Sequence, residues 1–238
     1  MTEKERSNTA FYVFPFKVIL SPFKAFIEIA QHPDVKGIAL IAALTLFATT
    51  GFYYAYSAKL VYYSNGTPTR FLSSNLFPGF ITSILAQEAL SFIFSWLFYA
   101  GILFLIMRAF GQKGGSWRQF FILIGYALSI VIVQSGVNAL LVATLPELHF
   151  STLNSWPPST PDEIAIVNTG IQETWGPLLA FQAFTFFNFP LVNIIDLWLL
   201  LLSVIIVKTF NEIPWSTATM ITITAFILRF FLKIFLGF

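Results

Sequence analysis

The sequence contains no cysteine, and only 10% of its 238 residues are charged. Without cysteine the chain cannot form disulfides, thiolate nucleophiles, iron–sulfur clusters or cysteine-ligated zinc sites. An average soluble domain carries about 25% charged residues, whereas 57% of the residues here are hydrophobic. Because a water-soluble fold of this length could not bury so much apolar surface, the composition predicts an integral membrane protein.

Groups that carry chemistry are scarce as well. The two histidines, His32 and His149, are predicted on opposite sides of the membrane, so one subunit cannot bring them together around a metal ion. The glycine-rich segment 111–118 lacks the spacing of a phosphate-binding loop. We therefore expect no enzyme, no cofactor and no metal site. The net charge of +2 comes from scattered basic residues, which argues against a nucleic-acid partner.

Five apolar runs reach the ~20 residues that a helix needs to cross about 30 Å of hydrocarbon. They cover approximately residues 37–57, 88–108, 119–145, 178–207 and 215–235. The predicted fold class is an all-α polytopic membrane bundle with about five transmembrane helices. Its predicted parts are a cytoplasmic N-terminal region, 1–36, and a five-span domain, 37–238, which includes an exterior loop, 146–176. Within that loop, residues 162–175 favour a short helix that ends before Gly176 and Pro177.

The distribution of basic residues predicts the orientation. Nine of the thirteen Lys and Arg residues lie inside if the N-terminus and the turns near residues 108–118 and 208–214 are cytoplasmic; the other four are Lys59, Arg70, Arg229 and Lys233. We therefore expect the N-terminus in the cytoplasm and the C-terminus outside, in a multi-pass protein of the cell membrane. Asn65 begins an Asn-Gly-Thr acceptor pattern for N-glycosylation, which this orientation places outside.

We expect no cleavable signal peptide in the N-terminal region, because no compact apolar stretch there ends in a small-residue cleavage site, but the region does contain an amphipathic segment. Ser21 and Pro22 resemble a helix start, and Phe23, Phe26 and Ile27 then share one helical face. An aromatic face of this kind is typical of a helix that lies in the membrane interface. An ordinary helix packed on the cytoplasmic end of the bundle fits the pattern equally well.

Asp196 is the most informative ionisable residue. It precedes Lys208 by twelve residues, so a rise of ~1.5 Å per residue places it roughly 18 Å from the cytoplasmic boundary. Arg229 lies at a comparable depth, about 22 Å, in the last span. Asp196 could pair with Arg229, or bond to the nearby amides, and simply order the bundle; alternatively, these groups could line a hydrated pathway. The amide candidates are Asn193, Asn188, Gln134 and Asn138.

Several short segments together resemble the Yip domain family. They are Leu20-Ser21-Pro22-Phe23-Lys24-Ala25-Phe26, His32-Pro33, Gly114-Gly115-Ser116-Trp117-Arg118-Gln119, Gly125-Tyr126-Ala127, Leu197-Trp198 and Ser216-Thr217-Ala218. The resemblance implies a five-span membrane protein with a cytoplasmic N-terminus, and eukaryotic members associate with Rab-type GTPases in vesicle traffic. Residues 128–131 lack the proline that often follows the Gly-Tyr pair in the family, and the 36 residues before the first span are shorter than the long cytosolic region of eukaryotic members, so we expect a prokaryotic-type member. We transfer no functional residues.

These observations leave three hypotheses for function. The first is a non-enzymatic membrane scaffold or adaptor of the Yip kind, which organises the bilayer or acts in membrane traffic. The second is a transporter or channel component that uses Asp196, and the third is an accessory subunit of a larger membrane complex. The expected partners are the lipid bilayer, other membrane proteins and, in a homo-oligomer, further copies of the chain.

Overall fold

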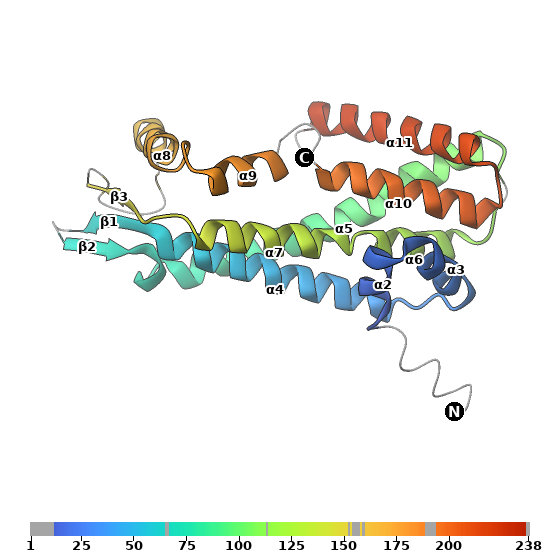
Figure 1. Ribbon diagram of the computed structural model, residues 1–238, viewed down its shortest axis with the longest axis horizontal. Helices are drawn as coiled ribbons and strands as arrows, with labels where there is room; N and C mark the ends of the chain where they lie inside the picture. Colours follow the sequence, from blue (N-terminus) through green and yellow to red (C-terminus); the bar gives the residue numbers. More distant parts are fainter. Residues whose placement is uncertain are drawn as a thin grey trace. The chain divides into compact units, whose positions relative to one another are not determined.

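The computed structural model describes residues 12–64, 67–112, 114–151, 153, 158, 160–188 and 194–236 (Figure 1). Asn65 and Asn193, two of the predicted site residues, lie outside the described residues. The chain divides into two compact units: unit 1 comprises residues 1–45, 89–132 and 191–238, and unit 2 comprises residues 46–88 and 133–190. Each candidate site described here lies within one unit.

The described helices confirm an all-α polytopic membrane protein. Three are long and apolar enough to cross a bilayer, namely Lys36–Lys59, Phe77–Ala109 and Trp117–Ala143, and Trp215–Phe231 is a shorter apolar helix. The second of these is α5, which begins eleven residues before the predicted start of its span at residue 88. The total of five spans stays a prediction.

Unit 1 begins with two short helices that pack against longer ones. Helix α2 (Phe14–Leu20) and α3 (Pro22–Gln31) lie against each other and against α6 (Trp117–Ala127), and α3 also contacts α10 (Ile194–Asn211). Lys17 of α2 forms a salt bridge with Glu28 of α3. Helix α11 (Trp215–Leu236) packs beside α10. Unit 1 also contains parts of α4 (Lys36–Lys59) and α5.

Helix α3 packs against protein on one face, and the contact of its other face with the membrane interface stays a prediction. Phe26 is fully buried together with Ala25 and Ile29 in the core of unit 1, so this part of the predicted aromatic face contacts protein. Phe23 and Ile27 remain exposed, at 42% and 37%. Helix α3 is therefore packed against protein on the side of Phe26, while the side that carries Phe23 and Ile27 is exposed.

A break separates α6 from α7 (Ile130–Ala143) although no proline is present there. The amide of Ser129 donates to the carbonyl of Tyr126, and that of Ile132 donates to the carbonyl of Ser129, so the hydrogen bonds span three residues instead of four. Such a tightened turn interrupts the regular α-helix. The helix is thus interrupted directly after the Gly125-Tyr126-Ala127 segment.

Unit 2 combines helices with a small sheet that the sequence did not predict. Strand β1 (Leu60–Ser64) pairs antiparallel with β2 (Thr67–Arg70) and parallel with β3 (Leu148–Phe150). A short turn of 3-10 helix, η1 (Phe71–Ser73), follows β2. The helix predicted within residues 162–175 is present as α8 (Pro161–Thr174), whose first turn is capped by reciprocal hydrogen bonds between Thr160 and Glu163. Helix α9 (Leu179–Phe187) completes unit 2.

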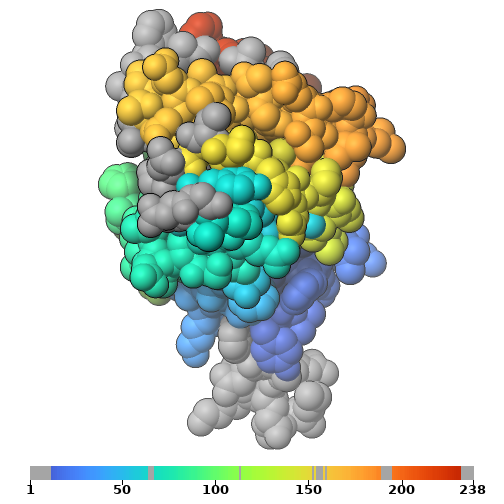
Figure 2. Space-filling view, turned by 90° about the vertical axis from the view of Figure 1, so that its left-hand side faces the viewer, coloured from blue at the N-terminus to red at the C-terminus, as the bar shows by residue number. Residues whose placement is uncertain are grey.

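Aromatic side chains form the core of unit 2. Trp175 is 2% exposed and packs edge-on against Tyr56, and its ring also contacts Phe181. In the space-filling view, the strands β1 and β2 are cyan and α8 is yellow to orange (Figure 2). Contacts between α8 and β3 connect this helix to the sheet.

Candidate functional site

The first candidate site is an ion pair within unit 1. Oδ1 of Asp196 on α10 lies 3.5 Å from Nη1 of Arg229 on α11, and the two side chains are 18% and 25% exposed. The guanidinium of Arg229 also lies over the ring of Tyr99, 5.0 Å from its centroid, at a distance where a cation is attracted to the aromatic face. The pairing that the sequence offered as one alternative is thus present.

Tyr99 extends this ion pair into a buried polar network. Its hydroxyl, on α5, donates to Oγ of Ser203 at 2.9 Å, and Ser203 in turn donates to the carbonyl of Leu199. Both Tyr99 and Ser203 are buried. The sequence analysis missed them, because a tyrosine and a serine within apolar runs give no signal of their own. Three helices, α5, α10 and α11, are joined by these contacts.

The second candidate site is an amide cluster in unit 2. Asn188 accepts hydrogen bonds from Asn138 at 3.0 Å and from Gln134 at 3.2 Å, and it donates back to Asn138 at 2.9 Å. Gln134 and Asn138 share one face of α7, four residues apart. The predicted set of intramembrane residues therefore separates into two groups, an ion pair in unit 1 and an amide cluster in unit 2.

The third candidate site is an open cleft of about 570 Å³ in unit 1, which we call the boundary cleft. Helix α3, the start of α6 and the end of α10 supply its walls. Its lining residues include Phe23, Ile27, Gln119, Lys208, Phe210 and Glu212. Lys208 closes one predicted span, and the next begins near residue 215, so the cleft lies at the predicted cytoplasmic boundary of the membrane.

Segments of the family-like sequence shape the boundary cleft. The Gly114 amide donates to Oδ1 of Asn211 at 3.1 Å, and Nε2 of Gln119 donates to the carbonyl of Ala30 at 2.6 Å. A Cβ atom at Gly114 would lie 2.8 Å from the Phe210 backbone carbonyl oxygen as well as 2.3 Å from that Asn211 oxygen, so this close approach favours glycine. The 114–119 segment is therefore fixed to α3 on one side and to the end of α10 on the other.

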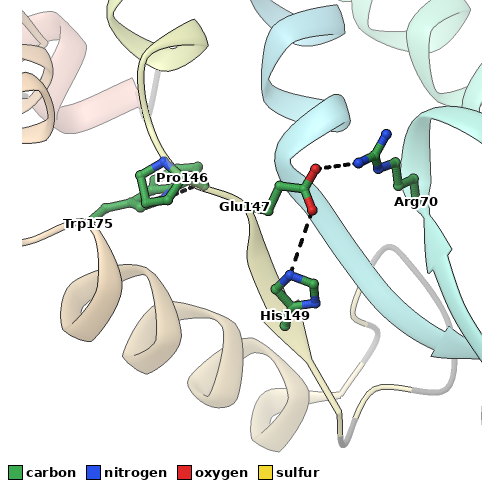
Figure 3. Close-up of polar contacts among 5 residues, drawn as sticks. All are labelled: Arg70, Pro146, Glu147, His149 and Trp175. Carbon is green, nitrogen blue, oxygen red and sulfur yellow. Dashed lines mark hydrogen bonds and ion pairs between the residues drawn. The ribbon is translucent and has the colours of Figure 1, made fainter.

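The fourth candidate site is a charged cluster at the surface of unit 2 (Figure 3). The Glu147 carboxylate lies 2.5 Å from Nη2 of Arg70 and 3.7 Å from Nε2 of His149. Nearby, the Trp175 indole donates to the Pro146 carbonyl at 3.0 Å. In the part of the chain that the structure describes, no group of three or more metal-ligating residues occurs. These contacts connect the end of β2 and the end of α8 to residues 146 and 147, just before β3.

Comparison with known proteins identifies one family. The family model described as the Yip1 domain matches residues 16–236. The match includes the segments that line the boundary cleft as well as Asp196 and Arg229. No curated protein and no solved structure shows significant similarity to the chain.

Proposed function

The chain belongs to the Yip1 domain family, and from this premise we propose that it is a non-enzymatic scaffold or adaptor of the membrane. In this role it holds partner proteins together or organises the bilayer around them. We propose further that it lies in the cell membrane with its N-terminus in the cytoplasm, as the distribution of its basic residues suggests.

The observation that supports a scaffold is the way the intramembrane polar groups are used. Asp196 lies against Arg229, which is itself covered by the Tyr99 ring, and Asn188 is bonded to two amides of α7. Charges inside a membrane are costly and usually pair with one another or line a functional pathway. Here the pairs connect neighbouring helices, as expected for groups that order a rigid bundle.

The transporter alternative depends on the same ion pair. Asp196 and Arg229 keep 18% and 25% of their side-chain surface exposed, and such groups could exchange protons or ions with a hydrated path. A transport role requires Asp196→Asn to abolish flux while the protein still folds. A scaffold role requires the same substitution to change stability, with no flux to lose.

The scaffold proposal is tested by isolating the protein from its native membrane in mild detergent and quantifying every protein that stays bound. We expect at least one partner at fixed stoichiometry. Arg118→Glu reverses an exposed charge on the predicted cytoplasmic side, and Glu173→Lys is the matched reversal on the predicted exterior side. Loss of the partner with Arg118→Glu alone supports cytoplasmic docking.

Two outcomes would contradict these proposals. A protein that is isolated alone, without partners or further copies of itself, argues against a scaffold. A partner that is lost only with Glu173→Lys keeps the scaffold and overturns the predicted docking side. If every copy of the protein co-purifies with one complex, the protein is an accessory subunit of that complex and does not act as a separate scaffold.

A further inference from the structure

We propose that the boundary cleft binds the headgroup of a membrane phospholipid that carries both a phosphate and a primary amine. In this arrangement the phosphate lies against Lys208 and the amine lies near Glu212. The inference goes beyond the scaffold proposal and does not depend on any protein partner.

Lys208 is the first observation that supports this site. Its ammonium lies 5.2 Å from the centroid of the Trp215 ring and 6.0 Å from that of Phe23. Among the described residues no carboxylate lies within 4.0 Å of it, although four other ion pairs form elsewhere. A lysine ammonium has three hydrogen-bond donors and no acceptor. Aromatic faces attract its charge but leave those donors available for an anion.

The aromatic neighbours place this cation at the depth of lipid headgroups. Trp215 is 50% exposed and Phe23 is 42% exposed, although both are large and apolar. Tryptophan is enriched where membrane meets water, and lysine extends its charged end towards the same layer. Lys208 and Trp215 also mark the ends of two consecutive apolar runs. A phosphate that reaches Lys208 here belongs to a lipid whose chains can stay in the hydrocarbon.

The remaining polar groups of the cleft complement a zwitterionic headgroup. Glu212 and Lys208 are the ionisable residues of the lining, so the cleft carries one charge of each sign. A purely anionic headgroup would satisfy Lys208 but repel Glu212. Gln31 and Thr209 also line the cleft.

The size of the cleft suits this ligand. Small-molecule sites usually have volumes of about 300–1,000 Å³, and the boundary cleft measures about 570 Å³. Phe23, Ile27 and Phe210 supply an apolar wall for the glycerol region. The open cleft therefore brings together a cation, an anion and an apolar wall.

The test is native mass spectrometry of the full chain in mixed micelles that contain equal amounts of phosphatidylethanolamine, phosphatidylcholine and phosphatidylglycerol. We expect one phosphatidylethanolamine to be retained preferentially. Lys208→Gln removes a charged hydrogen-bond donor and should weaken retention about tenfold or more. Glu212→Gln should reduce the preference for the primary amine over choline, whose methylated nitrogen cannot donate. Lys24→Gln, an exposed charge on α3 outside the cleft lining, is the matched control and should change nothing.

Several results would overturn the proposal. Equal retention of the three lipids, stronger retention of phosphatidylglycerol, or the same loss with Lys24→Gln as with Lys208→Gln would each exclude this headgroup site. Displacement of the lipid by millimolar inorganic phosphate would indicate a free anion as the ligand. If Lys208→Gln fails to fold, Lys208→Arg serves as the second variant, because it keeps the charge and the hydrogen-bond donors and should retain the lipid. A folded Lys208→Arg protein that does not retain the lipid would also overturn the proposal. Competition by a protein would assign the cleft to a partner.

Discussion

Neutralising Asp196 should destabilise the bundle, and neutralising Arg229 as well should restore most of the loss. Removal of one member of a buried ion pair typically costs about 3–5 kcal/mol, because the other charge is left without its partner. Here the two charged atoms are 3.5 Å apart, and the side chains of Asp196 and Arg229 are 18% and 25% exposed. Because partial exposure lets solvent screen the charges, the expected cost of Asp196→Asn is lower, about 2–3 kcal/mol. For a chain of this length that corresponds to a fall in melting temperature of roughly 4–12 °C.

The assay is thermal unfolding in detergent micelles, followed by intrinsic tryptophan fluorescence, for Asp196→Asn, Arg229→Gln and the double variant. The double variant should be less destabilised than the sum of the two single variants by about 2 kcal/mol, because it leaves no unpaired charge. Arg118→Gln, which removes an exposed charge from α6, is the control and should stay within about 0.5 kcal/mol of the parent protein. Additive single effects would refute the idea that the two charges depend on each other.

Three further predictions concern packing and hydrogen bonding. Asn188→Ala should cost about 1–3 kcal/mol in unfolding free energy, because it leaves the nearly buried amide of Asn138 without its partner; a melting temperature equal to that of the parent protein would contradict this. Gly37→Ala should destabilise the protein by about 1–3 kcal/mol, because its Cβ atom would lie 2.2 Å from an atom of the Tyr126 ring. Gly51→Ala, on the same helix, meets no atom within 4 Å and should be tolerated. Equal effects of the two substitutions on the melting temperature would contradict this packing. Trp175→Phe should lose the indole hydrogen bond to a backbone carbonyl and increase amide hydrogen exchange in unit 2; unchanged exchange there would contradict this.

The sequence could predict the class of the protein, and it offered the pairing of Asp196 with Arg229 as one of several alternatives. Composition and apolar runs indicate a helical membrane protein without any knowledge of contacts, because the hydrocarbon sets the length of a spanning helix. Counting residues from Lys208 and from Pro214 placed Asp196 and Arg229 at similar depths, and the structure brings the two side chains together. The depth of a residue in the membrane follows from its distance along the helix, and the number of residues from the helix end is enough to calculate that distance.

Contacts that depend on packing could not be predicted in the same way. The segment before Ser21 forms α2, a helix of seven residues that is too short for a periodic pattern to reveal. Phe26 shares a sequence face with Phe23, yet one is buried and the other is exposed, because α3 has protein on one side only. The boundary cleft requires three separate segments to meet, and Lys208 by itself was informative only as the end of a span.

The most direct test of the proposed scaffold role is a flux measurement on the reconstituted protein. Proteoliposomes that contain the folded chain, and parallel vesicles with folded Asp196→Asn, are loaded with a pH-sensitive dye and with small radiolabelled solutes. A structural role for the ion pair predicts that neither protein conducts protons or solutes faster than protein-free vesicles, while Asp196→Asn melts at a lower temperature. Flux that is present with the parent chain and absent with a stable Asp196→Asn would show that the pair serves transport, and it would contradict the scaffold proposal.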